Sequence, residues 1–80
     1  IMLKADGYDE AIMGVVERCG QEQVLLYDTK KIIQILVDRD EMTHEEAEDF
    51  FVYNILGSWV GDDTPAFFYT SEESYSEYLI

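Results

Sequence analysis

The strongest constraint on the fold is a helix start at residues 43–46, Thr-His-Glu-Glu. Thr43 can accept a hydrogen bond from the backbone N–H of Glu46, and the Glu46 carboxylate can accept one from the N–H of Thr43, which together make a capping box. Gly57 is the usual kind of residue at a helix end. The pattern therefore predicts a helix from about residue 44 to 56, amphipathic in its first half and apolar nearly all round in its second.

This helix has more apolar residues than one buried stripe can use. The stripe expected to face the core consists of Ala47, Phe50, Phe51 and Ile55, with Asn54 inside it as a hydrogen-bonded core or interface amide or, alternatively, a ligand contact. The remaining apolar residues predict an exposed patch that serves as an oligomer interface: Val52, Tyr53, Leu56 and Trp59. The alternative is that the last strand or the tail, through Tyr75, Tyr78 and Leu79, covers this patch within one chain. Glu45, Glu46 and Asp49 face away from the core and predict an acidic surface for a basic partner.

A second amphipathic helix is expected at residues 29–39, with Asp28 as its N-cap. Its apolar residues fall on one side: Ile32, Ile33, Ile35, Leu36 and Val37. The short connection at residues 40–42 makes the two helices antiparallel neighbours.

Two β-prone segments, 10–18 and 23–27, flank the four residues Cys-Gly-Gln-Glu and predict a hairpin. Gly14 inside the first segment predicts a bulge or a close backbone approach. The loop at residues 5–9 is expected to be exposed. After Pro65, the run Ala-Phe-Phe-Tyr suits a buried strand.

The order ββααβ predicts one α+β domain over residues 1–80, an antiparallel sheet with two helices packed on one face. The ends, 1–9 and 71–80, are expected to be loosely ordered, and Ser71 could instead cap one more short helix. A single cysteine excludes an intrachain disulfide, so oligomerisation is the remaining way for a small core to gain stability.

The net charge is −13, and residues 41–80 contain no Lys or Arg. This argues against direct binding to nucleic acid or to an anionic membrane, because both need cations to neutralise phosphates. If the charge serves binding, a basic protein is the better expectation for a partner, but solubility alone is the favoured explanation of the charge. No apolar run resembles a signal peptide or a membrane span, so a cytoplasmic location is expected.

No catalytic, cofactor or metal motif is present. Residues 38–42 begin like a calcium loop, but Met42 takes a ligand position and Thr43 stands where the loop needs glycine. His44 lacks the second histidine of a zinc-protease helix. Asp62 and Asp63 are read as turn residues rather than as paired catalytic carboxylates.

Cys19 is the only nucleophile to consider. The neighbouring Arg18 could lower its pKa, and a turn would expose the thiol. A cysteine nucleophile also needs a base, and the only histidine, His44, is expected to start a helix elsewhere. An ordinary turn cysteine is therefore the favoured interpretation.

Five segments resemble a family of short uncharacterised proteins from bacteriophage and marine metagenomic sequences. They are GYDEAIMGV, RCGQ, VLLYD, ILVDRDEMTHEEAEDFF and NILGSWVGDDTP, and they cover about residues 6–69. Glu41 departs from the family's Asp-Gly-Met at the turn between the helices. The resemblance implies a viral or marine setting and assigns no activity to any residue.

These observations favour a non-enzymatic, homo-oligomeric interaction module. Two alternatives stay open. The first is an acidic mimic of nucleic acid that occupies a basic site on a host protein, and the second is a cysteine-dependent enzyme.

Overall fold

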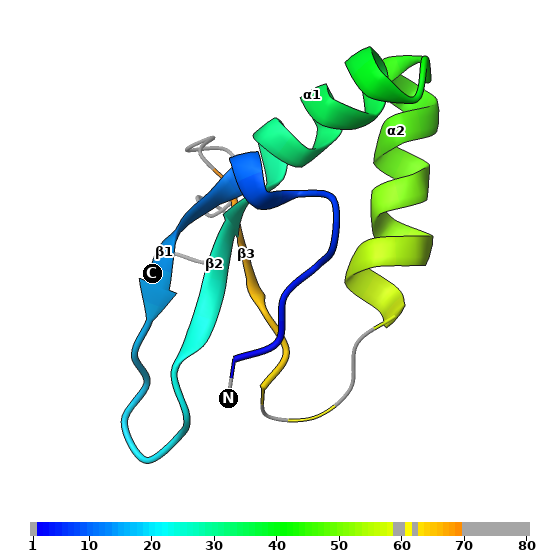
Figure 1. Ribbon diagram of the computed structural model, residues 1–80. Coiled ribbons are helices and arrows are strands. Elements are labelled where there is room, and N and C mark those ends of the chain that lie inside the picture. The colour runs from blue at the N-terminus through cyan, green and yellow to red at the C-terminus, as the bar shows by residue number, and fades with distance from the viewer. Residues whose placement is uncertain (1, 59–60, 62, 70–80) are drawn as a thin grey trace, which may run out of the picture.

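The computed structural model describes residues 2–58, 61 and 63–69, and it shows a three-stranded sheet with two helices (Figure 1). The α+β class and the order ββααβ are confirmed. The strands are β1 (Ile12–Val16), β2 (Val24–Asp28) and β3 (Ala66–Phe68), and the helices are α1 (Thr29–Arg39) and α2 (His44–Phe50). Three short turns complete the described elements: two 3-10 turns, η1 (Asp9–Ala11) and η3 (Leu56–Ser58), and a π-helical turn, η2 (Phe51–Ile55).

The hairpin and its bulge are as predicted. β1 and β2 pair antiparallel, with Val15 opposite Leu25, and the register shifts between Ile12 and Gly14. Gly14 has a φ of +153°, and a Cβ added there would meet no atom within 4 Å. The glycine is therefore needed for the backbone conformation of the bulge and not for a close approach.

The third strand corrects one part of the predicted sheet. β3 pairs with β2 in parallel, with Phe67 beside Tyr27, so the sheet is mixed and not wholly antiparallel. The reason is visible in Figure 1: α1 carries the chain away from β2, and α2 brings it back to the end where β2 began. β3 then starts from that end and runs in the same direction as β2, with the helices as the crossover that parallel pairing requires.

Helix α1 begins at an N-cap residue and ends before a residue in the left-handed conformation. The Asp28 carboxylate accepts a hydrogen bond from the backbone N–H of Lys30 at 3.0 Å, as an N-cap should. At the other end, Glu41 follows the C-cap residue with a φ of +56°, in the left-handed region. Helices commonly end in this conformation, and glycine is the residue that adopts it without strain.

The second predicted helix, 44–56, is an α-helix only as far as Phe50. The π turn η2 follows, in which the backbone N–H of Leu56 donates to the carbonyl of Phe51. A π turn holds more residues than an α turn, so it rotates the later side chains back around the axis. Ile55 therefore stays in line with Ala47 and is buried, whereas Asn54 is turned out and exposed.

The core lies between one face of the sheet and the helices. Tyr27, Ile32 and Leu36 are fully buried at its centre. The Phe67 ring stacks on Tyr27 with centroids 5.9 Å apart and makes a T-shaped contact with Phe51, with centroids 5.2 Å apart. Since Phe51 lies in η2 and Phe67 in β3, this aromatic contact joins the helical layer to the sheet.

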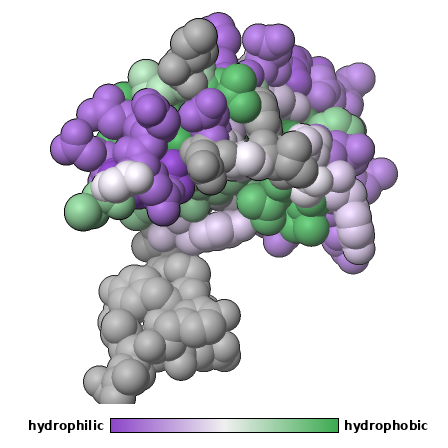
Figure 2. Space-filling model, turned by 90° about the horizontal axis from the view of Figure 1, so that it is seen from below, coloured by the Kyte–Doolittle hydropathy of each residue, from purple (hydrophilic) through white to green (hydrophobic). Residues whose placement is uncertain are grey.

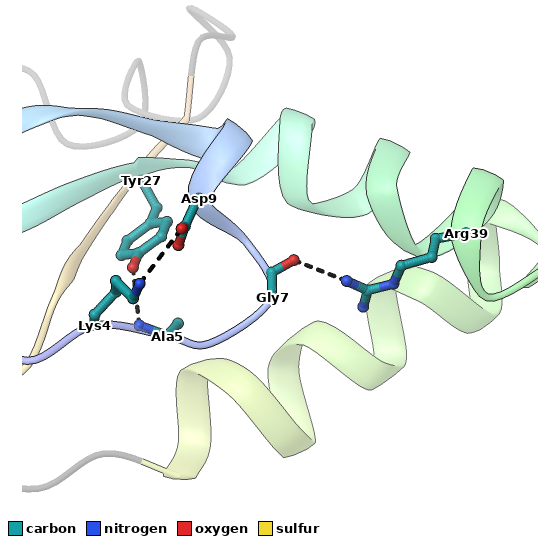
Figure 3. A network of polar contacts seen from close by, with 6 residues as sticks. All are labelled: Lys4, Ala5, Gly7, Asp9, Tyr27 and Arg39. Atoms are coloured by element: carbon teal, nitrogen blue, oxygen red, sulfur yellow. Dashed lines mark hydrogen bonds and ion pairs between the residues drawn. The ribbon is translucent and has the colours of Figure 1, made fainter.

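The N-terminal segment, expected to be an exposed loop, is partly buried. Ala5 and Tyr8 both belong to the core. Tyr27 Oη accepts a hydrogen bond from the backbone N–H of Ala5 at 2.8 Å, and Arg39 Nη1 donates to the carbonyl of Gly7 at 2.8 Å (Figure 3). We call residues 2–8 the N-terminal strap, because these bonds tie it to β2 and to the end of α1.

Arg39 is the anchor of the strap on α1. Its guanidinium lies 5.1 Å from the centroid of the Tyr8 ring and pairs with Asp40 through a 3.0 Å contact between Nε and Oδ1. The hydrogen bond to Asp40 raises the pKa of Arg39, and the same bond lowers the pKa of the Asp40 carboxyl. Both groups thus stay charged at neutral pH.

Candidate functional site

The exposed side of α2 and its π turn carries the residues that the sequence singled out for binding. Val52, Tyr53 and Leu56 are 47%, 76% and 42% exposed, and we call them the α2 apolar patch. Residues 50–61 contain no charged side chain, in a chain of net charge −13. The patch itself therefore carries no charge, although Glu48 and Asp49 lie one turn before it on the same helix.

The first turns of the same helix are acidic. Glu45, Glu46 and Asp49, which we call the α2 acidic face, are all exposed. The capping box is present: Thr43 Oγ1 accepts from the N–H of Glu46 at 3.1 Å, and Glu46 Oε1 accepts from the N–H of Thr43 at 2.9 Å. The hydrogen bond from the Thr43 backbone lowers the pKa of Glu46, which keeps this carboxylate ionised.

A shallow hollow joins the acidic residues to aromatic ones. It has a volume of about 340 Å³, and we call it the α2 groove. The residues that line it come from the α1–α2 connection, α2 and η2: Met42, Glu46, Asp49, Phe50, Tyr53 and Asn54. From the sequence, Phe50 is expected only in the stripe that faces the core, and Met42 is not expected to take part in binding. The spacing of residues 46, 49, 50 and 53 already indicated one helical stripe that combines carboxylates and aromatic rings.

Apolar groups reach the surface in separate areas. Figure 2 views the molecule from the end at which the β1–β2 turn lies, and it shows hydrophobic atoms in green between hydrophilic ones in purple. Other exposed apolar side chains, among them Met13 and Val15 in β1, lie outside the α2 apolar patch. They provide matched positions for testing whether exposure alone causes self-association.

A hollow of similar volume, about 340 Å³, lies between α1 and α2. His44 Nδ1 lies 2.8 Å from Glu48 Oε1 at its wall, and Phe51 and Val52 contribute apolar surface. Thr29 also lines it, but its hydroxyl oxygen is buried and has no hydrogen-bond partner. Because that oxygen exposes almost no surface, it offers no binding group to a ligand in this hollow.

A larger hollow than these two, about 470 Å³, lies between the N-terminal strap and α1. Three of its lining residues are cations, Lys4, Lys31 and Arg39, in a chain with only five Lys and Arg. Lys4 pairs with Asp9 at 3.4 Å (Figure 3), and Arg39 pairs with Asp40. Acidic side chains also line this hollow, so it has no clear preference for an anion.

Cys19 is exposed in the β1–β2 turn, as predicted. The adjacent Arg18 donates from Nη2 to the carbonyl of Glu22 at 3.1 Å, which directs the guanidinium across the turn. His44 instead starts α2 and contacts Glu48. The structure therefore does not bring the thiol and the imidazole together.

Within the described part of the chain, no group of three or more His, Cys, Asp or Glu side chains could hold a metal ion. Nor does any described helix have the length and apolar character to cross a membrane. The predictions made for Trp59, Asp62 and residues 71–80 lie outside the described residues.

Comparison with known proteins adds no relative. No protein-family model matches the chain, and neither curated proteins nor solved structures give a significant match. The phage and marine metagenomic family indicated by the sequence therefore stays a prediction.

Proposed function

We propose that this protein is a small interaction module that forms a homodimer through the α2 apolar patch. The observation that carries the proposal is the exposure of Val52, Tyr53 and Leu56 together at one helix end. Exposed apolar groups at one place more often mark an interface than an isolated surface residue does.

Charge supports the choice of this surface over others. Two molecules that each carry −13 repel one another, and the repulsion is weakest where charged groups are sparse. The α2 apolar patch belongs to the uncharged run 50–61, and the α2 acidic face lies toward the other end of the helix. A two-fold axis at the patch needs only one self-complementary surface and leaves the carboxylates at the hydrated rim.

The test is the molar mass in solution by size-exclusion chromatography with light scattering at 0.15 M and 0.5 M salt. We expect the wild type to have about twice the 9.3 kDa of one chain, and Val52→Glu/Leu56→Glu to be a folded monomer. Met13→Glu/Val15→Glu, which adds the same two charges at exposed side chains of β1, should remain dimeric. A wild-type monomer at high micromolar concentration would overturn the proposal. So would a double variant that unfolds, because the patch would then belong to the core of one chain.

A second candidate function is binding to a basic protein, in the manner of a nucleic-acid mimic. What supports it is that Glu45, Glu46 and Asp49 are all exposed on one helix and that no Lys or Arg occurs after residue 40. Such a surface would attract a basic site and release it as salt is raised.

Competition with DNA tests this second function. The protein should displace labelled duplex DNA from at least one of a panel of basic DNA-binding proteins at low salt. The variant Glu45→Lys/Asp49→Lys should fail to do so, and it keeps Glu46 and therefore the capping box. Absence of displacement across the panel, or equal displacement by the variant, would remove this candidate.

A further inference from the structure

The α2 groove combines two kinds of group, apolar or aromatic side chains and carboxylates. Met42 and Phe50 line it and are half-buried against the core. Tyr53, most of whose surface is exposed, lines it as well, together with Glu46 and Asp49. The groove thus brings apolar, aromatic and negatively charged side chains to one place.

Both carboxylates are available to a partner. The Asp49 carboxylate has no hydrogen bond or ion pair with any described residue. Glu46 uses Oε1 for the Thr43 N–H, which leaves Oε2 with no partner in the described chain. All five Lys and Arg precede residue 40, so no Lys or Arg from the second half of the chain can neutralise these two carboxylates.

These groups suit one side chain better than any other. The arginine guanidinium is planar, permanently charged and weakly hydrated, so it can bind carboxylates at its edge and stack on an aromatic ring with its face. The methylene groups of the same side chain can lie on apolar surface such as Met42 and Phe50. A hard metal ion would gain no binding energy from the aromatic rings, and a lysine ammonium would gain less than a guanidinium from stacking on them.

We infer that the α2 groove is a docking site for an arginine side chain presented by a flexible basic segment of a partner protein. The inference rests on the second candidate function, the binding of a basic protein, and names the group that is recognised. It applies to the monomer, because the homodimer proposed above would cover Tyr53. Charge complementarity brings the segment to α2, and the groove selects arginine from other cations.

The experiment uses three labelled peptides that share a Gly-Ser background and carry three arginines, three lysines or three citrullines. Citrulline has nearly the shape of arginine without its charge. Binding to the full chain is measured by fluorescence anisotropy at low salt. We expect the arginine peptide to bind most tightly, the lysine peptide about two- to five-fold more weakly, and the citrulline peptide not measurably.

Variants then separate the groove from general charge. Asp49→Asn/Tyr53→Leu should weaken the arginine peptide about ten-fold, because it removes one surface ion pair and one cation–π contact. Glu45→Gln removes an equal charge from the same helix at a residue that does not line the groove, and it should change affinity less than two-fold. Tyr53 is also part of the α2 apolar patch, so the molar mass of each variant is measured in the same buffer.

The outcomes distinguish the inference from the function on which it rests. Equal loss in Asp49→Asn/Tyr53→Leu and Glu45→Gln, or equal affinity for the arginine and lysine peptides, would overturn the arginine site and leave the acidic surface standing. No binding of either cationic peptide would overturn both. A loss confined to Asp49→Asn/Tyr53→Leu, with an unchanged molar mass, would establish the site.

Discussion

Replacing Glu41 with glycine should stabilise the protein, although Glu41 makes no core contact. Its φ of +56° lies in the left-handed region, which costs a residue with a side chain about 1–2 kcal/mol. Glycine removes this strain but loses more backbone entropy on folding, by about 0.5–1 kcal/mol. The net expectation is a gain of about 0.5–1 kcal/mol in the free energy of unfolding.

The gain is large enough to measure. In a domain of 60–100 residues, 1 kcal/mol shifts the melting temperature by about 4–8 °C, so Glu41→Gly should melt roughly 2–8 °C higher. Urea denaturation of the same variant should give a higher midpoint with an unchanged slope, because the surface exposed on unfolding stays the same.

The control must separate strain from charge, because the substitution also removes one carboxylate from an acidic protein. Glu41→Ala removes the same charge and keeps the left-handed strain, so it should lie within about 0.5 kcal/mol of the wild type. Glu41→Asn should fall between the two, since asparagine tolerates this conformation better than alanine. If Glu41→Ala gains as much as Glu41→Gly, the reasoning from backbone strain is refuted.

Three further predictions follow from the described contacts. Tyr27→Phe leaves the N–H of Ala5 without its acceptor and should cost about 1–3 kcal/mol in urea denaturation, whereas the exposed Tyr53→Phe should cost nothing measurable. Folding lowers the pKa of Glu46, so the stability contributed by its carboxylate is present above the ordinary pKa of 4.5. That stability is lost as the pH falls through the lower pKa of the folded state. The melting temperatures of the wild type and Glu46→Gln should therefore converge in acid. The melting temperature should rise from low salt to physiological ionic strength, because screening relieves the repulsion of a chain at −13, and a flat curve would contradict this.

Local features could be predicted from the sequence because their causes lie within a few residues. The capping box needs only Thr43 and Glu46, and the N-cap of α1 needs only Asp28 and the next turn. The bulge at Gly14 follows from a glycine inside a β-prone run. The exposure of the α2 apolar patch was also predictable, since one helix can bury only one stripe.

The groove is an intermediate case. The spacing of Glu46, Asp49, Phe50 and Tyr53 places them along one side of a helix, and that spacing is readable in the sequence. Whether the side is flat or hollow depends on how deeply Phe50 and Met42 sink toward the core, and both are half-buried. Only the packed structure could show that a hollow remains there.

The sequence by itself determined the helices, their caps, the β1–β2 hairpin and the order of elements, because these depend on contacts between near neighbours. The tertiary structure decided the direction of β3, which follows from the return path of α2, and the burial of the N-terminal strap, which depends on Tyr27 and Arg39 far along the chain. It also decided the π turn, because Ile55 can pack into the core in line with Ala47 only if the helix widens there, which leaves Asn54 exposed. These three features depend on packing between segments far apart in the sequence, so no local sequence pattern could predict them.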